Sequence, residues 1–251
     1  MKPKWLNRLA LLAALSSTCM AYEPGADDIT TVSSRASSDY IRVRQANGTY
    51  AAETYAFGNG GVWPGDMKDD SFDKVEFLEV GHMIAYPLAG QHYYPSTDPN
   101  RTNLLIMVYW GTTRQPPPQA SQMLIQMVVR RNIRMLGYES WYNQTNMDLR
   151  GTALQQHKTD LYVEIGENRY FVVLMAYDFQ LLWKEKKHRL LWETRFSLRQ
   201  HFHEFDKELP SMALYASRYF GEDTGGLIHE PVPKGNVEIG SVKSLGEVPQ
   251  K

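Results

Sequence analysis

Two carboxylates, Asp178 and Glu193, lie within a stretch whose alternating apolar residues predict a β-hairpin, and such a pair could perform acid-base chemistry. A short loop around residues 185–186 would place the two side chains opposite each other. Carboxylates that share one proton have separated pKa values, so one can act as the acid and the other as the base. Alternatively, Arg195 lies diagonal to Asp178 in this register and would neutralise the pair at the sheet surface.

Two histidines, His201 and His203, alternate along the chain beside Glu204 and could supply two metal ligands from an extended segment. A solvated connection between a strand and a helix accounts for the same residues. Because no third ligand follows at a motif spacing, we expect no metal ion and no other cofactor. The glycine-rich residues 58–61 match neither the dinucleotide fingerprint nor the P-loop, and the chain has no nucleophile elbow. These patterns leave enzymatic activity undecided and favour a protein that is not an enzyme.

The first residues have the layout of an export signal. Basic residues precede the apolar run 9–15, and small polar residues complete a signal peptide over 1–21. Cleavage after Ala21 would leave no thiol, since Cys19 is the only cysteine in the chain. Cleavage just before Cys19 would instead give a lipoprotein with its lipid on that residue. The sequence therefore predicts an exported protein of the periplasm or outer cell envelope, either soluble or tethered through Cys19.

Composition limits the remaining partners. The chain has 251 residues, of which 43% are hydrophobic, so it can bury a substantial core. Its formal net charge is -1 and its cations form no long basic run, so nucleic acid is not an expected partner. No stretch offers about 20 uninterrupted apolar residues, and we expect no integral membrane span. The expected partner is an unknown envelope protein or another envelope component.

Composition also divides the exported chain into three parts. Residues 22–49 are rich in Ser, Asp and Thr and are expected to form a polar spacer. Residues 50–221 are expected to fold as a single α+β domain. Residues 222–251 contain the Gly and Pro of a tail that drapes over the domain or stays free of it. Residues 115–168 have no assigned role, but Trp141 and Tyr142 are candidates for an exposed apolar binding patch.

Periodicity predicts the elements of the domain, which we expect to be a mainly antiparallel sheet covered by about three helices. The expected strands are 54–57, a buried strand at 102–113 and a long hairpin over 170–199. The expected helices are 71–85 with Ser71 as N-cap, 119–136 closed by a left-handed Gly137, and a last helix from Asp206 to Gly221. In the hairpin, pairing Val173 with Leu198 gathers the large apolar residues on one face.

The order of these elements resembles a family of small bacterial envelope proteins and lipoproteins of unknown function. The matching stretches are TYAF at 54–57, LAGQHY at 88–93, NLLIMV at 103–108 and LLWET at 190–194. The resemblance implies an α+β sandwich and an envelope location, and it carries no catalytic residues. It favours an exported, non-enzymatic binding or accessory protein of unknown ligand. An exported hydrolase that uses Asp178 and Glu193, or a metal held by His201 and His203, is the alternative.

Overall fold

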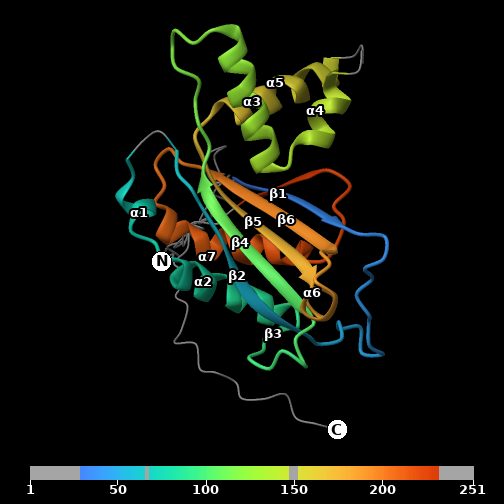
Figure 1. Ribbon diagram of the computed structural model, residues 1–251. Coiled ribbons are helices and arrows are strands. Elements are labelled where there is room, and N and C mark those ends of the chain that lie inside the picture. The colour runs from blue at the N-terminus through green and yellow to red at the C-terminus, as the bar shows by residue number, and fades with distance from the viewer. Residues whose placement is uncertain (1–28, 66–67, 147–151, 232–251) are drawn as a thin grey trace, which may run out of the picture.

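One mixed sheet of seven strands, in the order β3-β2-β4-β5-β6-β1-β7, forms the centre of the protein in the computed structural model (Figure 1). The structure describes residues 29–65, 68–146 and 152–231. The strands are β1 (Ile29–Ala36), β2 (Glu53–Trp63), β3 (Tyr93–Pro95), β4 (Leu104–Thr112), β5 (Arg169–Asp178), β6 (Leu190–Arg199) and β7 (Leu227–Pro231). β2 runs parallel to β3 and β4, whereas the other neighbouring pairs are antiparallel. The α+β class is confirmed, but the sheet is mixed rather than mainly antiparallel.

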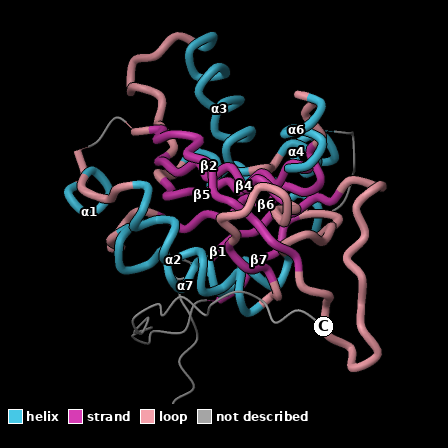
Figure 2. Tube along the Cα trace, turned by 60° about the horizontal axis from the view of Figure 1, so that its bottom comes forward, coloured by secondary structure: helices cyan, strands magenta, loops and turns pink. Residues whose placement is uncertain are grey.

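Helices cover both faces of this sheet. α2 and α7 pack on one face, and α3, α4 and α5 form a smaller layer on the other (Figures 1 and 2). The helices of the described residues are α1 (Asp70–Asp73), α2 (Phe77–Gly90), α3 (Gln122–Leu136), α4 (Glu139–Asn146), α5 (Thr152–Gly166), α6 (Phe179–Glu185) and α7 (Phe205–Ala216), which a short 3-10 helix (Ser217–Tyr219) follows. The chain therefore contains more helices than the three expected.

β5 links the two helical layers because it is apolar on both faces. Val172 and Leu174 point toward α2 and α7, while Phe171 and Val173 point toward the layer of α3 and α5. All four side chains are buried. A strand that is apolar on both faces belongs inside a sheet, and β5 pairs with β4 on one side and β6 on the other.

The predicted hairpin register is wrong. Val173 pairs with Arg195 rather than with Leu198, and Val172 pairs with Phe196. The reason is α6, which replaces the expected short loop because the Asp178 side chain accepts a hydrogen bond from the amide of Leu181 and caps a new helix. The residues of this helix leave the ladder, so the return strand begins later than a short loop would allow.

The interpretation of residues 22–49 as a spacer is wrong for β1, which lies inside the sheet between β6 and β7. The hydroxyl side chains of Thr31, Ser33 and Ser34 are buried and find partners there: Ser34 Oγ lies 2.7 Å from Thr194 Oγ1 and donates to the Tyr219 carbonyl at 2.8 Å. The start of the tail is also ordered, as β7 pairs with β1. The expected signal peptide, Cys19 and residues 232–251 lie outside the described residues.

Several other helix and strand boundaries differ from the predicted ones, because local caps or turns determine where the elements begin and end. The helix expected at 71–85 is two helices, and Asp69 rather than Ser71 caps the first. β2 continues beyond the expected strand 54–57 through the glycine-rich residues 58–61, with an irregularity between Asn59 and Gly61. The N-cap of α7 is Glu204 and not Asp206. The α3 prediction is confirmed, because the helix ends at Leu136 and Gly137 follows with φ 76°.

We expect Gly137→Ala to lower the free energy of unfolding by about 1–3 kcal/mol, as measured by urea denaturation. The residue has a left-handed backbone, and an added Cβ would lie 2.8 Å from Arg195 Cδ and 3.0 Å from Ser33 Cβ. Gly90→Ala is the matched control, since a Cβ at the end of α2 meets nothing within 4 Å and should leave stability equal or slightly higher. Equal losses in both variants would contradict this account.

Candidate ligand-binding site

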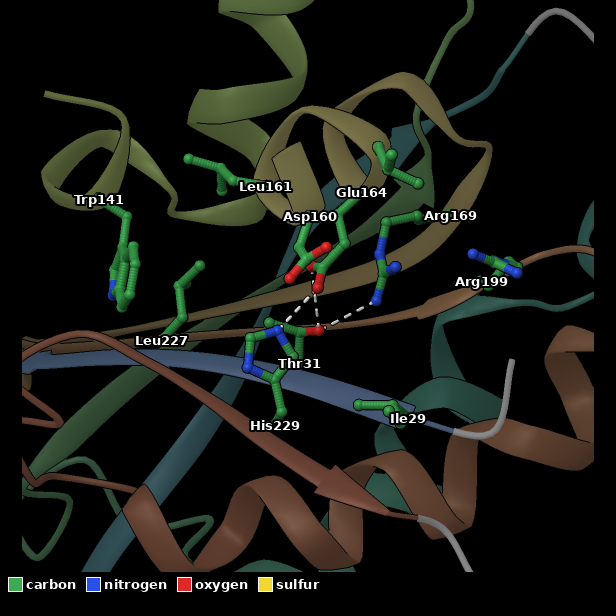
Figure 3. A pocket seen from close by; sticks show the side chains of 11 residues that line it. Ile29, Thr31, Trp141, Asp160, Leu161, Glu164, Arg169, Arg199, Leu227 and His229 are labelled. Carbon is green, nitrogen blue, oxygen red and sulfur yellow. Dashed lines mark hydrogen bonds and ion pairs between the residues drawn. The ribbon is translucent and has the colours of Figure 1, made fainter. Parts of the chain in front are cut away.

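A cleft of about 430 Å³ lies between α5 and the edge of the sheet formed by β1 and β7 (Figure 3). This volume is within the range of small-molecule sites. Side chains from α4, α5, β1, β7 and the ends of β5 and β6 line it. They are Ile29, Thr31, Trp141, Asp160, Leu161, Val163, Glu164, Arg169, Arg199, Leu227 and His229. The elements of the smaller helical layer therefore create a concave site where they meet the sheet edge.

One end of the cleft is apolar. Trp141 of α4 and Leu227 of β7 lie at the same side of the cleft in Figure 3, with Leu161 of α5 above them. Leu161 is buried in the second core, and both Trp141 and Leu227 pack against that core. Trp141 and Tyr142 were predicted to form an exposed patch, but both are half-buried. Trp141 therefore offers one wall of a cleft rather than an open surface.

The centre of the cleft holds an ionised carboxylate. Glu164 Oε1 lies 2.7 Å from Nε2 of His229, and Glu164 Oε2 accepts a hydrogen bond of 2.6 Å from the Tyr138 hydroxyl. Thr31 Oγ1 donates to the same Oε2 at 3.4 Å. Figure 3 shows Glu164 pointing from α5 toward His229 and Thr31, so this carboxylate joins the helix to both edge strands.

The other end of the cleft is formed by two arginines, whose charges are paired with carboxylates. Arg169 is only 3% exposed, and its guanidinium donates to Ser197 Oγ and to Thr31 Oγ1, both at 3.1 Å. Arg199 forms a bidentate ion pair with Glu167, whose carboxylate also lies 3.8 Å from Arg169. Buried guanidinium groups require such partners, since an unpaired charge is costly in the interior.

These contacts determine the protonation state of Glu164 at the centre of the cleft. Burial by itself would raise the pKa of Glu164, but its bond to His229, the charges of Arg169 and His229, and the Tyr138 hydroxyl lower it to about 2. Burial raises the pKa of Tyr138, so its phenol stays a neutral hydrogen-bond donor. The cleft therefore presents an ionised carboxylate, a guanidinium end and an apolar end in one space, which suits a ligand with a polar head and an apolar body.

The structure does not bring the predicted carboxylate pair together. Asp178 caps α6 and pairs with Arg189, whereas Glu193 lies opposite Met175 in the sheet and forms an ion pair of 3.0 Å with Arg195. The backbone amide of Leu181 and the charge of Arg189 lower the pKa of Asp178 despite its burial, which alone would raise it. Neither carboxylate lines the cleft.

The predicted histidine pair also lies elsewhere. The rings of His201 and Phe202 are tilted by 43° with centroids 3.7 Å apart, and the backbone carbonyl of His203 accepts a hydrogen bond from Tyr170. In the described part of the chain, no three His, Cys, Asp or Glu side chains form a group that could hold a metal ion.

Sequence reasoning missed the residues that line the cleft because most lie in segments without an assigned element. Glu164 and Leu161 belong to residues 137–168, for which no element was predicted, Thr31 to the expected spacer, and His229 to the expected tail. Two signals were present: the β-branched run ITTV at 29–32 favours a strand, and LIHEP at 227–231 is bounded by glycine and proline. Neither signal reveals that the two segments meet α5.

No family model and no curated protein matches the chain. Among solved structures, it is similar to a PDZ domain protein from Parabacteroides distasonis ATCC 8503, with a TM-score of 0.41 and 11% sequence identity. The match covers 80% of this chain and 38% of that one, so the chain spans well under half the length of that protein. A likeness of this degree carries no argument about fold or function. No helix in the described ranges is long and apolar enough to cross a membrane.

We expect Glu164→Gln to destabilise the protein by up to about 3 kcal/mol at pH 7. The folded-state pKa is depressed, so the stabilisation by ionised Glu164 is fully present above its unfolded value near 4.5 and is lost as the pH falls toward 2. Urea unfolding at several pH values should show the difference between wild type and variant shrink between pH 4.5 and 2.

The matched control is Glu185→Gln on α6, because that carboxylate is exposed and pairs only with exposed Lys187 among the ion pairs found. Its free energy of unfolding should follow that of the wild type at every pH. A constant difference between Glu164→Gln and wild type from pH 7 to 2 would show that the ionised state of Glu164 does not stabilise the fold.

Proposed function

We propose that this protein is an exported, non-enzymatic binding module of the cell envelope, and that it holds a small ligand with a polar head and an apolar body in the cleft between α5 and β7. The export signal expected at 1–21 supports the compartment. The observation that carries the binding role is the cleft itself, which combines the apolar wall of Trp141 with the ionised Glu164 and the guanidinium of Arg169.

The polar groups of the cleft favour binding over nucleophilic catalysis. Thr31 is the one hydroxyl-bearing residue among the lining residues that the structure describes, and its oxygen accepts from Arg169 and donates to Glu164. His229 Nε2 faces Glu164 rather than Thr31, and the group that accepts the Thr31 hydroxyl is the Glu164 carboxylate, whose pKa of about 2 makes it a weak base. These interactions hold the site in shape before a ligand arrives, which reduces the ordering cost of binding.

The amphipathic dye 1-anilinonaphthalene-8-sulfonate is a suitable first probe, because its rings match the apolar wall and its sulfonate can accept hydrogen bonds from the arginines at the other end. We expect its fluorescence titration to show saturable binding, weakened about tenfold by Trp141→Ala through loss of aromatic contact. Leu227→Ser removes an apolar side chain of β7 from the same side of the cleft and should also weaken dye binding.

Trp183→Ala is the matched control, since Trp183 is exposed on α6, away from the cleft. Thermal unfolding of each variant shows whether the fold is intact. Dye affinity that is equal in wild type, Trp141→Ala and Leu227→Ser, all folded, would overturn the cleft as the binding site. If the cleft residues control affinity, competition of the dye by envelope extracts then identifies the natural ligand.

A further inference from the structure

The segment from residue 113 to residue 138 carries positive charge only. It contains Arg114, Arg130, Arg131 and Arg134 and no aspartate or glutamate, in a chain whose formal net charge is -1. The three last arginines lie in α3, within two turns of one another. Positive charge is therefore concentrated on one helix, and its first acidic neighbour is Glu139, which lies 3.9 Å from Arg134.

The first turns of α3 expose apolar side chains beside these arginines. Met123 is 74% exposed and Met127 is 58% exposed, and Leu124 is also exposed. Figures 1 and 2 both show this end of α3 standing out from the body of the protein. The helix is held by its other end, where Ile133 and Leu136 are buried. The exposed methionines are thus not needed to dock α3 on the sheet.

The end of β2 extends the same surface. Val62 and Trp63 are large, exposed apolar residues, and the Arg131 guanidinium lies 6.0 Å from the Trp63 ring centroid. We define the α3 prong as Met123, Leu124, Met127, Arg130 and Arg134, with Trp63 at its base. Tryptophan beside arginine is typical of residues that meet the boundary between lipid head groups and acyl chains.

We propose that the α3 prong binds the surface of an anionic lipid bilayer. Arginines would pair with lipid phosphates while the methionines and Leu124 enter the head-group boundary, as in interfacial amphipathic helices. A second copy of this chain fits less well, because two prongs would bring like-charged arginines together, with Glu139 beside Arg134 offsetting only part of their charge. The protruding shape also suits a deformable lipid surface, whereas a protein partner would need a matching groove.

A second basic surface in the described chain, at the end of α6, has acidic partners of its own. Lys187 pairs with Glu185, and Arg189 pairs with Asp178. Arg134 of the prong pairs with Glu139 in a similar way, so this second basic surface is a matched comparison that lacks the exposed methionines of the prong.

Vesicle flotation tests the proposal with the whole chain, so that the N-terminal segment is common to wild type and variants. We expect binding to vesicles of phosphatidylglycerol and phosphatidylcholine to exceed binding to pure phosphatidylcholine at least about fivefold and to weaken with added salt. Both Met123→Gln with Met127→Gln and Arg130→Gln with Arg134→Gln should reduce the bound fraction about fivefold or more.

Two variants serve as matched controls. Leu78→Gln with Tyr86→Gln removes two exposed apolar side chains from α2, which covers the other face of the sheet. Lys184→Gln with Lys187→Gln removes two charges from α6. Both should bind vesicles as wild type does. The proposal is overturned if the prong variants bind vesicles like wild type, if the α6 variant loses vesicle binding equally, or if anionic lipid does not increase binding. None of these outcomes bears on dye binding in the cleft.

Discussion

The buried guanidinium of Arg169 is the constraint around which one end of the molecule is organised. The Arg169 side chain is 3% exposed, so its charge must be matched by partners inside the protein. Those partners lie on β1, on β6 and on or beside α5. Thr31 of β1 and Ser197 of β6 accept its hydrogen bonds, while the charges of Glu164 and Glu167 offset its own. The first strand, the end of the sheet and α5 are therefore held in one arrangement by the same group.

This arrangement explains why a cleft exists beside β7. The smaller helical layer packs its apolar residues on Phe171 and Val173 of β5, but at the edge of the sheet α5 also presents the carboxylate of Glu164. Because an ionised carboxylate needs polar partners and cannot be close-packed with apolar groups, the contact between α5 and β7 is a hydrogen-bonded bridge with space around it. The same interactions that stabilise the fold thus keep the site open and polar.

The two proposed surfaces use the smaller helical layer in different ways. Its inner side, with Trp141 and Leu161, borders the cleft, whereas the protruding end of α3 faces away from the sheet. A module anchored by such a prong would hold a cleft close to a lipid surface, where amphipathic ligands are concentrated. The two roles are independent, since no residue of the α3 prong lines the cleft.

The sequence by itself determined the elements that local periodicity and caps specify: the buried strand β4, the two-sided apolar strand β5, and α3 with its left-handed Gly137. It did not reveal β1, because the hydroxyls of Thr31 and Ser34 look like those of a solvated spacer until their partners on β6 and α5 are in place. The hairpin register depended on α6, since a capped helix and a short loop both satisfy the same alternation on β5. Only the tertiary structure reveals the cleft, because its polar residues come from segments that are distant in the sequence. These residues are Thr31, Glu164, Arg169 and His229. They interact only because folding buries them within hydrogen-bonding distance of one another.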